Sequence, residues 1–242
     1  MSISFNMSIA FCIGGGKIGR TGVQSLLDEG AKVLLVDPDE NCLARSLCHL
    51  SVEDPDSIID CEEGQALYLK RDGIEVLIEV FRRWVPDQII PAVKGHLAAR
   101  LAMAWANETH HSIHPSGNLL LKITDMLPID SVQFMDNAQG VLITSHMTTG
   151  SICKVGCGQP LTCPVTNKRS MPMYQLIDQA LTNIIEKYSI LVTQGANIGV
   201  LDGQDVKSML NIIDNLEDGA TFSVTTSCRC HAIVNLFRYY RC

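Results

Sequence analysis

The chain has 242 residues, which suits one large domain or two small ones, and 46% of them are hydrophobic, which suffices for a buried core. Its formal net charge of -7 argues against a nucleic-acid partner and against binding to an anionic membrane surface. Apolar runs are too short for a membrane span, and the first residues lack the basic segment of a secretion signal. We therefore expect a cytoplasmic protein with no membrane insertion.

The first elements predicted along the chain are a strand, a glycine loop, a helix and a second strand, all within about thirty residues. Apolar runs at 9–13 and 33–36 predict the two buried strands, and Gly30 ends the helix between them. Asp37 follows the second strand directly. Three glycines with the spacing G-x-G-x-x-G separate the first strand from the helix: Gly14, Gly16 and Gly19.

This order of elements is typical of a dinucleotide-binding site. Gly14 allows a tight turn, Gly16 lets a pyrophosphate approach the backbone, and Gly19 lets the helix pack on the sheet. The helix N-terminus offers unpaired N–H groups to the phosphates. Asp37 is positioned to accept hydrogen bonds from the adenosine ribose, which favours NAD over NADP, while FAD uses the same fingerprint. The predicted cofactor-binding residues are Gly14, Gly15, Gly16, Lys17, Ile18, Gly19, Asp37 and Asp39.

Because of the glycine loop and Asp37, the first fifty or so residues resemble the NAD(P)-binding Rossmann superfamily. Within it, the segment is similar to the nucleotide-binding domain of potassium-transport regulators, in which a glycine loop leads to a strand that ends D-x-D, here Asp37 and Asp39. The triplet Gly14–Gly16 also resembles the dehydrogenase domain of sirohaem synthesis. The resemblance implies a dinucleotide cofactor, whereas the reaction does not transfer with the motif.

The rest of the chain predicts a two-part α/β protein. We expect a Rossmann-like, doubly wound parallel sheet in residues 1–115 and a cysteine-containing, mixed α/β domain in residues 116–242, which could also continue the first sheet. The further predicted elements are a helix at 40–50, strand or helix at 66–70 and 74–81, a strand at 88–93, a helix at 95–107, strands at 119–123, 131–135 and 141–144, a helix at 174–187, a strand at 189–193, a helix at 205–216 and a strand at 219–226.

Two histidines are candidate catalytic groups. His96 starts a predicted helix just past a strand end, where ligands bind in open parallel sheets, although a helix-terminal histidine satisfied by solvent fits the pattern as well. His146 lies in a hydroxyl-rich stretch at 144–151. The H-H-x-x-H run at 110–114 is followed by proline and has no acid beside it, so we interpret it as a polar turn rather than a metal site.

The cysteines are the remaining candidates. Cys153, Cys157 and Cys163 have the spacing C-x3-C-x5-C among glycines and prolines, and Cys228 or Cys230 could complete four ligands for zinc or an iron–sulfur cluster. The last two are also predicted to lie where a strand ends and a helix begins, which would favour a nucleophilic or redox-active thiolate without metal. Ordinary semi-buried thiols are the third interpretation.

Two functions fit these patterns. The first is an NAD-dependent oxidoreductase in which the N-terminal half holds the dinucleotide and the C-terminal half binds an unidentified small molecule. The second is a non-catalytic dinucleotide sensor, and a metal- or cluster-containing enzyme is a further alternative. An exposed sheet edge would allow a homodimer.

Overall fold

The chain folds into two compact units. One comprises Met1–Leu97 with Val200–Lys207, and the other comprises Ala98–Gly199 with Ser208–Cys242. Each unit contains a sheet of its own with flanking helices, which confirms the predicted α/β class. The computed structural model describes residues 8–147, 151, 157–185, 189–193 and 199–241.

The border between the units lies at Leu97/Ala98, eighteen residues before the predicted border at 115/116. The physical reason is that the strand His111–Pro115 pairs with the last strand of the chain, so this segment belongs to the second sheet. From the C-terminal half, Leu201–Asp202 pair with the edge of the first sheet.

The first sheet is built from short apolar strands, of which the inner ones are buried and one edge strand is largely exposed. Its order is β10-β5-β1-β2-β4-β3, and all neighbours are parallel except β10 and β5. The strands are β1 (Ile9–Ile13), β2 (Lys32–Val36), β3 (Leu50–Val52), β4 (Ala66–Leu69), β5 (Gln88–Pro91) and β10 (Leu201–Asp202). Strand β1 lies between β2 and β5. The chain therefore forms β2, β3 and β4 on one side of β1 and then crosses to the other side to form β5.

Two helices cover opposite faces of this sheet. Helix α1 (Lys17–Asp28) packs its Gly22 on the side chain of Ile90, and α2 (Gly73–Arg83) packs its Gly73 on that of Ile13. Ile90 is in register with Cys12, the neighbour of Ile13, so the two isoleucines point to opposite faces. Asp72 caps α2 by accepting hydrogen bonds from the N–H groups of the first turn.

The ends of these elements follow the predicted signals, with one difference. Gly30, the predicted helix-ending glycine, has φ +83° at the end of α1. The expected helix at 40–50 is a short 3-10 helix, η1 (Leu43–Leu47), followed by the edge strand β3. The ambiguous run at 74–81 is helical, since its apolar residues line one face of α2. A second 3-10 helix, η2 (Pro55–Ile58), precedes β4.

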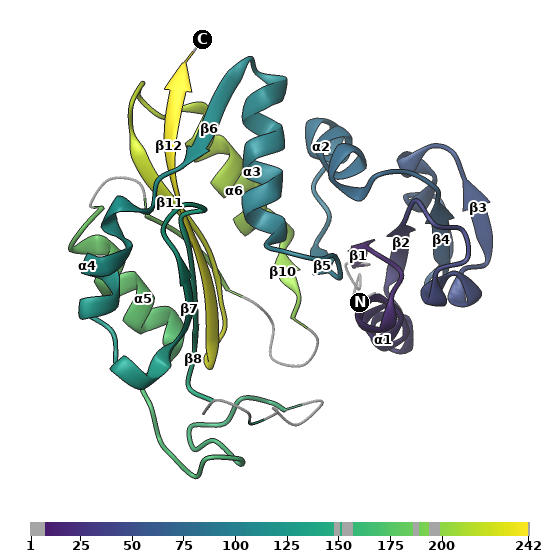
Figure 1. Cartoon of the computed structure of the whole chain (residues 1–242). Coiled ribbons are helices and arrows are strands. Elements are labelled where there is room, and N and C mark those ends of the chain that lie inside the picture. Colours follow the sequence, from purple (N-terminus) through teal and green to yellow (C-terminus); the bar gives the residue numbers. More distant parts are fainter. Residues whose placement is uncertain (1–7, 148–150, 152–156, 186–188, 194–198, 242) are drawn as a thin grey trace, which may run out of the picture. The chain divides into compact units, whose positions relative to one another are not determined.

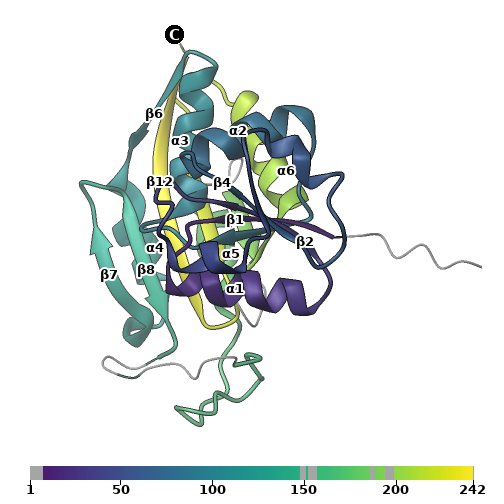
Figure 2. The ribbon, with the colours of Figure 1, turned by 90° about the vertical axis from the view of Figure 1, so that its right-hand side faces the viewer.

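The second sheet is organised around its long last strand. Its order is β7-β8-β12-β11-β9, and β6 lies beside the C-terminal half of β12 while β8 lies beside the N-terminal half (Figure 2). All neighbours are antiparallel except β11 and β9. The strands are β6 (His111–Pro115), β7 (Val132–Asp136), β8 (Val141–Ser145), β9 (Ser189–Thr193), β11 (Thr221–Ser227) and β12 (His231–Arg241).

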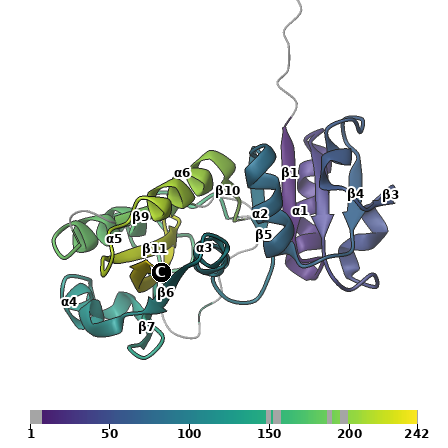
Figure 3. The ribbon, with the colours of Figure 1, turned by 90° about the horizontal axis from the view of Figure 1, so that it is seen from above.

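Helices cover both faces of the second sheet (Figures 1 and 3). On one side, α4 (Leu120–Asp125) and α5 (Met173–Thr182) close a core of buried leucine, isoleucine and alanine side chains over β8 and β12. On the other side lie α3 (Leu97–Glu108) and α6 (Gly203–Asp214), which are joined by a 2.7 Å hydrogen bond from Trp105 Nε1 to Asp214 Oδ1.

Three expectations for this half are wrong. The run 119–123 is helical, because Leu120 and Ile123 recur at helical spacing and pack into the core of α4 and α5. His111 and His114 lie in β6 rather than in a turn, and their rings contact two different tyrosines. Residues after Cys228 do not begin a helix, because the chain turns and continues as β12.

Among the described residues, no helix is both long and apolar enough to span a membrane.

Candidate functional site

The glycine loop between β1 and α1 is held in one conformation by close backbone contacts. The N–H of Gly14 donates to the carbonyl of Val36 at 2.9 Å, which ties the loop to the end of β2. Gly14 has φ +95°, and a Cβ there would lie 2.5 Å from the carbonyl oxygen of Ala92. A Cβ on Gly19 would collide with the carbonyl oxygen of Gly14. These two positions therefore require glycine for the turn and for the approach of α1.

Gly16 differs from its neighbours because no atom lies within 4 Å of the place where its Cβ would be. It is the N-cap residue of α1 and makes no side-chain capping bond. Gly16, Lys17 and Ile18 are exposed, whereas Gly14 and Gly15 are buried. The first turn of α1, with the positive end of its dipole, thus begins at an exposed residue without a side chain.

Asp37, at the end of β2, points at this loop. Its Oδ2 accepts a 2.6 Å hydrogen bond from the N–H of Gly15, and its Oδ1 accepts a 2.8 Å bond from the N–H of Asp39. Its own carbonyl accepts a bond from the hydroxyl of Tyr68 at 2.8 Å. Asp37 is half-buried, and each carboxylate oxygen keeps acceptor capacity beyond the bond it makes.

Asp39 lies further out and is exposed. Its carboxylate accepts a 2.9 Å bond from the N–H of Asn41, which stabilises the turn after β2. The two acids therefore have different roles in the structure. Asp37 contacts the glycine loop, and Asp39 stabilises the turn that follows.

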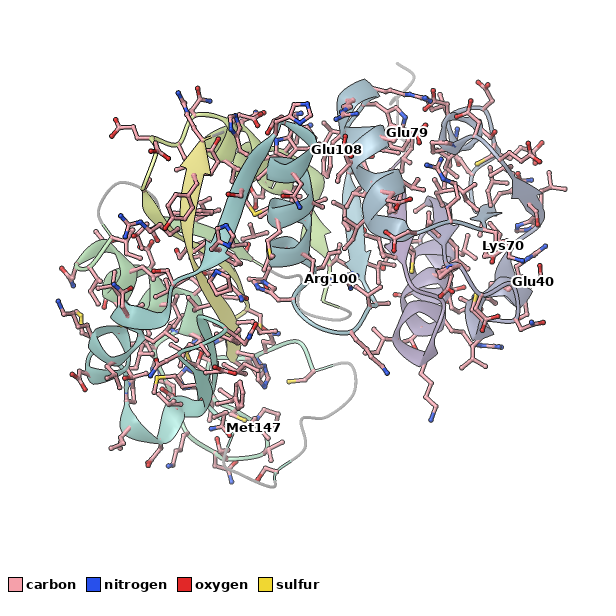
Figure 4. The ribbon with its side chains drawn as sticks, turned by 45° about the horizontal axis from the view of Figure 1, so that its top comes forward. Glu40, Lys70, Glu79, Arg100, Glu108 and Met147 are labelled. Carbon is pink, nitrogen blue, oxygen red and sulfur yellow. The ribbon has the colours of Figure 1, made fainter. Side chains whose placement is uncertain are left out.

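The segment 38–47 covers the middle glycine of the loop, a contact that the sequence did not predict. A Cβ on Gly15 would collide with the sulfur of Cys42, and the N–H of Ala44 donates to the carbonyl of Gly15 at 2.8 Å. Glu40 on this segment forms an ion pair of 2.8 Å with Lys70, just beyond β4 (Figure 4). The signal available in the sequence was the third consecutive glycine, because Gly15 has no place in the G-x-G-x-x-G spacing.

The thiols around this loop are protonated. Burial raises the pKa of Cys12, Cys42 and Cys48, in the last case to about 11. Two of these sulfurs contact backbone carbonyls, Cys12 Sγ that of Gly14 at 3.5 Å and Cys48 Sγ that of Ala44 at 3.8 Å. They are packing residues of the loop and not nucleophiles.

The two candidate histidines lie in different units. His96 is half-buried and directly precedes α3, in the unit that holds the glycine loop. His146 follows β8 in the other unit, and its Nε2 lies 2.8 Å from the carbonyl oxygen of Met171. Burial lowers the pKa of His146, assisted by the charges of His231 and Arg229 and opposed by the bond to Met171, so its ring is neutral near pH 7.

The cysteines predicted as metal ligands fall on two loops of the second unit. Cys157 and Cys163 lie between β8 and α5, and Cys228 and Cys230 lie in the turn between β11 and β12, while Cys153 lies outside the described residues. Among the residues that the structure describes, no three His, Cys, Asp or Glu side chains assemble into a group that could hold a metal ion. The zinc or cluster site, of which Cys153 is one predicted ligand, therefore stays a prediction.

One of these thiols has a partner of its own. Cys228 is buried, and its sulfur lies 3.6 Å from Nδ1 of His231. Burial alone would raise the pKa of Cys228, but hydrogen bonds from His231 and from the backbone outweigh it, so the pKa lies below the ordinary value. Cys163 and Cys230 line one small cavity with His146.

Comparison with known families divides the chain at the same place as the structure. Residues 9–97 match the family model AF_1314_N, described as an uncharacterized protein's N-terminal domain. Residues 98–240 match AF_1314_C, described as the C-terminal domain. Neither the curated proteins nor the solved structures contain a match to this chain.

Proposed function

We propose that this chain, which belongs to the AF_1314 family over both of its domains, binds NAD at the glycine loop of its N-terminal domain. The single observation that carries the proposal is the juxtaposition of the Asp37 carboxylate and the Gly15 N–H, 2.6 Å apart, beside the open space at Gly16. An acid for the ribose and an uncovered helix N-terminus for the pyrophosphate are the two contacts that such a cofactor requires.

The strand order supports a Rossmann-like interpretation of this domain. The strands β4-β2-β1-β5 correspond to the order 3-2-1-4 of a mononucleotide-binding half, with β3 and β10 as additions at the edges. The order reverses between β1 and β5. In open α/β sheets, ligands bind beyond the carboxyl ends of the strands at this reversal, and the glycine loop leaves the carboxyl end of β1.

NAD is the preferred cofactor because of the charge of Asp37. A 2′-phosphate on the ribose would meet the carboxylate directly, so NADP is expected to bind less tightly, and FAD remains the other cofactor with this fingerprint. We further propose that the protein is an oxidoreductase acting on a small molecule, with His96 as the candidate proton donor in the same unit.

A second candidate function, a dinucleotide sensor, is favoured by the segment 38–47. Asp37 already accepts two backbone bonds, and Cys42 and Ala44 cover Gly15. A ribose hydroxyl that donates to Asp37 shares the carboxylate with the N–H groups of Gly15 and Asp39, so that binding and the position of the segment are coupled. The ion pair of Glu40 and Lys70 is exposed and holds the segment only weakly.

Calorimetric titration of the full chain with NAD, NADP and FAD tests the binding proposal, and Gly16→Val provides the site control. Valine at Gly16 would fill the open space and block the phosphate, so we expect the binding heat of NAD to disappear. Gly158→Val is the matched control, because Gly158 also has no atom within 4 Å of its Cβ position but lies in the other unit. Equal binding by both variants would overturn the proposal. Oxidation of NADH with a panel of carbonyl compounds then separates an oxidoreductase from a sensor.

A further inference from the structure

The second unit contains a thiol that its own loop prepares for reaction. Residues 162–169 form a tight hairpin in which the N–H of Cys163 donates to the carbonyl of Lys168 at 3.0 Å and the N–H of Asn167 donates to the carbonyl of Cys163 at 2.8 Å. Within this hairpin, the sulfur of Cys163 accepts hydrogen bonds from the hydroxyl of Thr166 and from the N–H groups of Thr166 and Val165. These donors stabilise a thiolate and lower the pKa of Cys163.

A second thiol faces the same space. Cys163 and Cys230 both line a cavity of about 20 Å³, and neither is in a disulfide. A space of this size holds roughly one water molecule. The turn that carries Cys230 is fixed by three bonds to surrounding segments, from His146 N–H to Cys230 O, from Arg229 N–H to Gln159 Oε1 and from Met173 N–H to Arg229 O.

The surroundings of the two thiols are positively charged. Lys168 and Arg229 line the small cavity, and its described lining contains no acid. His146, Lys168 and Ser170 also line a larger cavity of about 300 Å³, which is the lower end of the size range of small-molecule sites. Asp130 also lines the larger cavity but not the small one that the two thiols line, so the positive charge is concentrated at Lys168 and Arg229 beside the thiols, where a small ligand that carries negative charge is favoured.

We propose that Cys163 and Cys230 form an exchange-active pair that reduces small disulfides carrying negative charge. The Cys163 thiolate attacks one sulfur of the substrate, forms a mixed disulfide and releases the first thiolate. Cys230 loses its proton and attacks the sulfur of Cys163, which forms the Cys163–Cys230 disulfide and releases the second thiolate. Over these two steps the pair loses two electrons, the substrate gains them and the proton of Cys230 passes to solvent, so a single turnover needs no further oxidant and leaves the pair as a disulfide.

This proposal stands apart from dinucleotide binding, because all of its residues belong to the second unit. It also differs from the metal prediction. A metal would occupy the lone pairs of Cys163, whereas exchange requires that the thiolate be open to attack an incoming sulfur.

The first test is the identity of the most reactive thiol. The reduced full chain is treated at pH 7 with less than one equivalent of iodoacetamide, and the alkylated cysteines are quantified by mass spectrometry. We expect Cys163 to react on the order of tenfold faster than Cys61, a partly exposed thiol whose pKa burial raises. Equal rates would overturn the proposal, as would a Cys163 that reacts only after a chelator removes a bound metal.

The second test concerns the second step, in which Cys230 attacks the mixed disulfide on Cys163. With one equivalent of dithiobis-nitrobenzoate, a doubly anionic disulfide, the wild-type chain is expected to release two thiolates per disulfide consumed and to contain the Cys163–Cys230 bond. Cys230→Ser is expected to release one and to retain the mixed disulfide on Cys163. A stable mixed disulfide in the wild-type chain would show that Cys230 does not act and would overturn the pair.

Two further variants test whether the Thr166 hydroxyl and the Arg229 charge affect the reactivity of Cys163 through hydrogen bonding and charge rather than through packing. Thr166→Val removes the hydroxyl at constant shape and is expected to raise the pH midpoint of Cys163 alkylation, while Thr166→Ser restores it. Arg229→Gln is expected to lower the rate with the anionic disulfide on the order of threefold and to leave the rate with neutral dithiodipyridine unchanged. Equal effects on both disulfides would refute the assigned charge preference.

Discussion

Replacement of Asp37 by alanine is the most informative single change, because this carboxylate has both a structural and a ligand-binding role. In the free protein it accepts bonds from the N–H groups of Gly15 and Asp39, at 2.6 and 2.8 Å. Bonds to a charged acceptor contribute about 1.5–3 kcal/mol each when buried, and Asp37 is half-exposed, so we expect Asp37→Ala to lower the free energy of unfolding by about 2 kcal/mol in total. Thermal unfolding should shift down by about 5 °C.

The effect on binding is separable from that on stability. Loss of the ribose contacts should weaken NAD by about 1.5–3 kcal/mol, or roughly 10- to 150-fold, whereas NADP should weaken less because the repulsion of its 2′-phosphate is also removed. Calorimetry with both cofactors, at a temperature well below unfolding, measures the ratio of the two dissociation constants. Asp39→Ala is the matched control, since Asp39 also accepts a backbone bond but is exposed. Equal losses for NAD and NADP in Asp37→Ala would refute the assignment of Asp37 to the ribose.

The remaining predictions concern one contrast of glycines and one titration. Gly19→Ala is expected to lower the free energy of unfolding of the first unit by about 1–3 kcal/mol, because the new Cβ meets the Gly14 carbonyl. Gly16→Ala places its Cβ in open space and should lower it by under about 1 kcal/mol. Urea unfolding of both variants measures the difference, and similar losses would contradict the loop geometry. The pKa of His146 is lowered in the folded state, so the stability that its neutral form contributes is present above its unfolded pKa, about 6.5, and is lost as pH falls through the folded value. In His146→Gln the free energy of unfolding should therefore fall less steeply below about pH 6.5 than in the wild-type chain. An unchanged pH profile would argue against a buried neutral ring.

The N-terminal elements could be predicted because their signals are local. The glycine spacing, the apolar runs and the acid after β2 all lie within one stretch of about thirty residues, and tertiary packing did not override them. Gly30, with its positive φ, is a further local signal that the structure bears out.

The errors arose where long-range contacts decide the structure. The run 119–123 is short and apolar, a pattern that suits a strand or a helix, and packing against α5 selected the helix. The unit border was misplaced because β6 pairs with β12, more than a hundred residues later in the chain, and no local pattern records that pairing. For the same reason, the shared cavity of Cys163 and Cys230 could not be read from the sequence.

The cysteine spacing is a weaker guide for a different reason. C-x3-C-x5-C suggested ligands of one metal, but of the cysteines that the structure describes, Cys163 is engaged by the donors of its own hairpin and Cys228 by His231. Spacing records which residues are near in sequence, whereas a metal site also requires that their sulfurs converge.

The measurement that tests the central claim most directly is amide hydrogen exchange of the full chain with and without NAD, followed by mass spectrometry of its peptides. If the glycine loop is the site, exchange must slow in peptides that contain Gly14–Arg20, since the pyrophosphate covers the first N–H groups of α1, and must change in those that contain Asp37–Ala44. Unchanged exchange in both segments at saturating NAD, or protection confined to other peptides, would contradict the assignment of the cofactor to this loop.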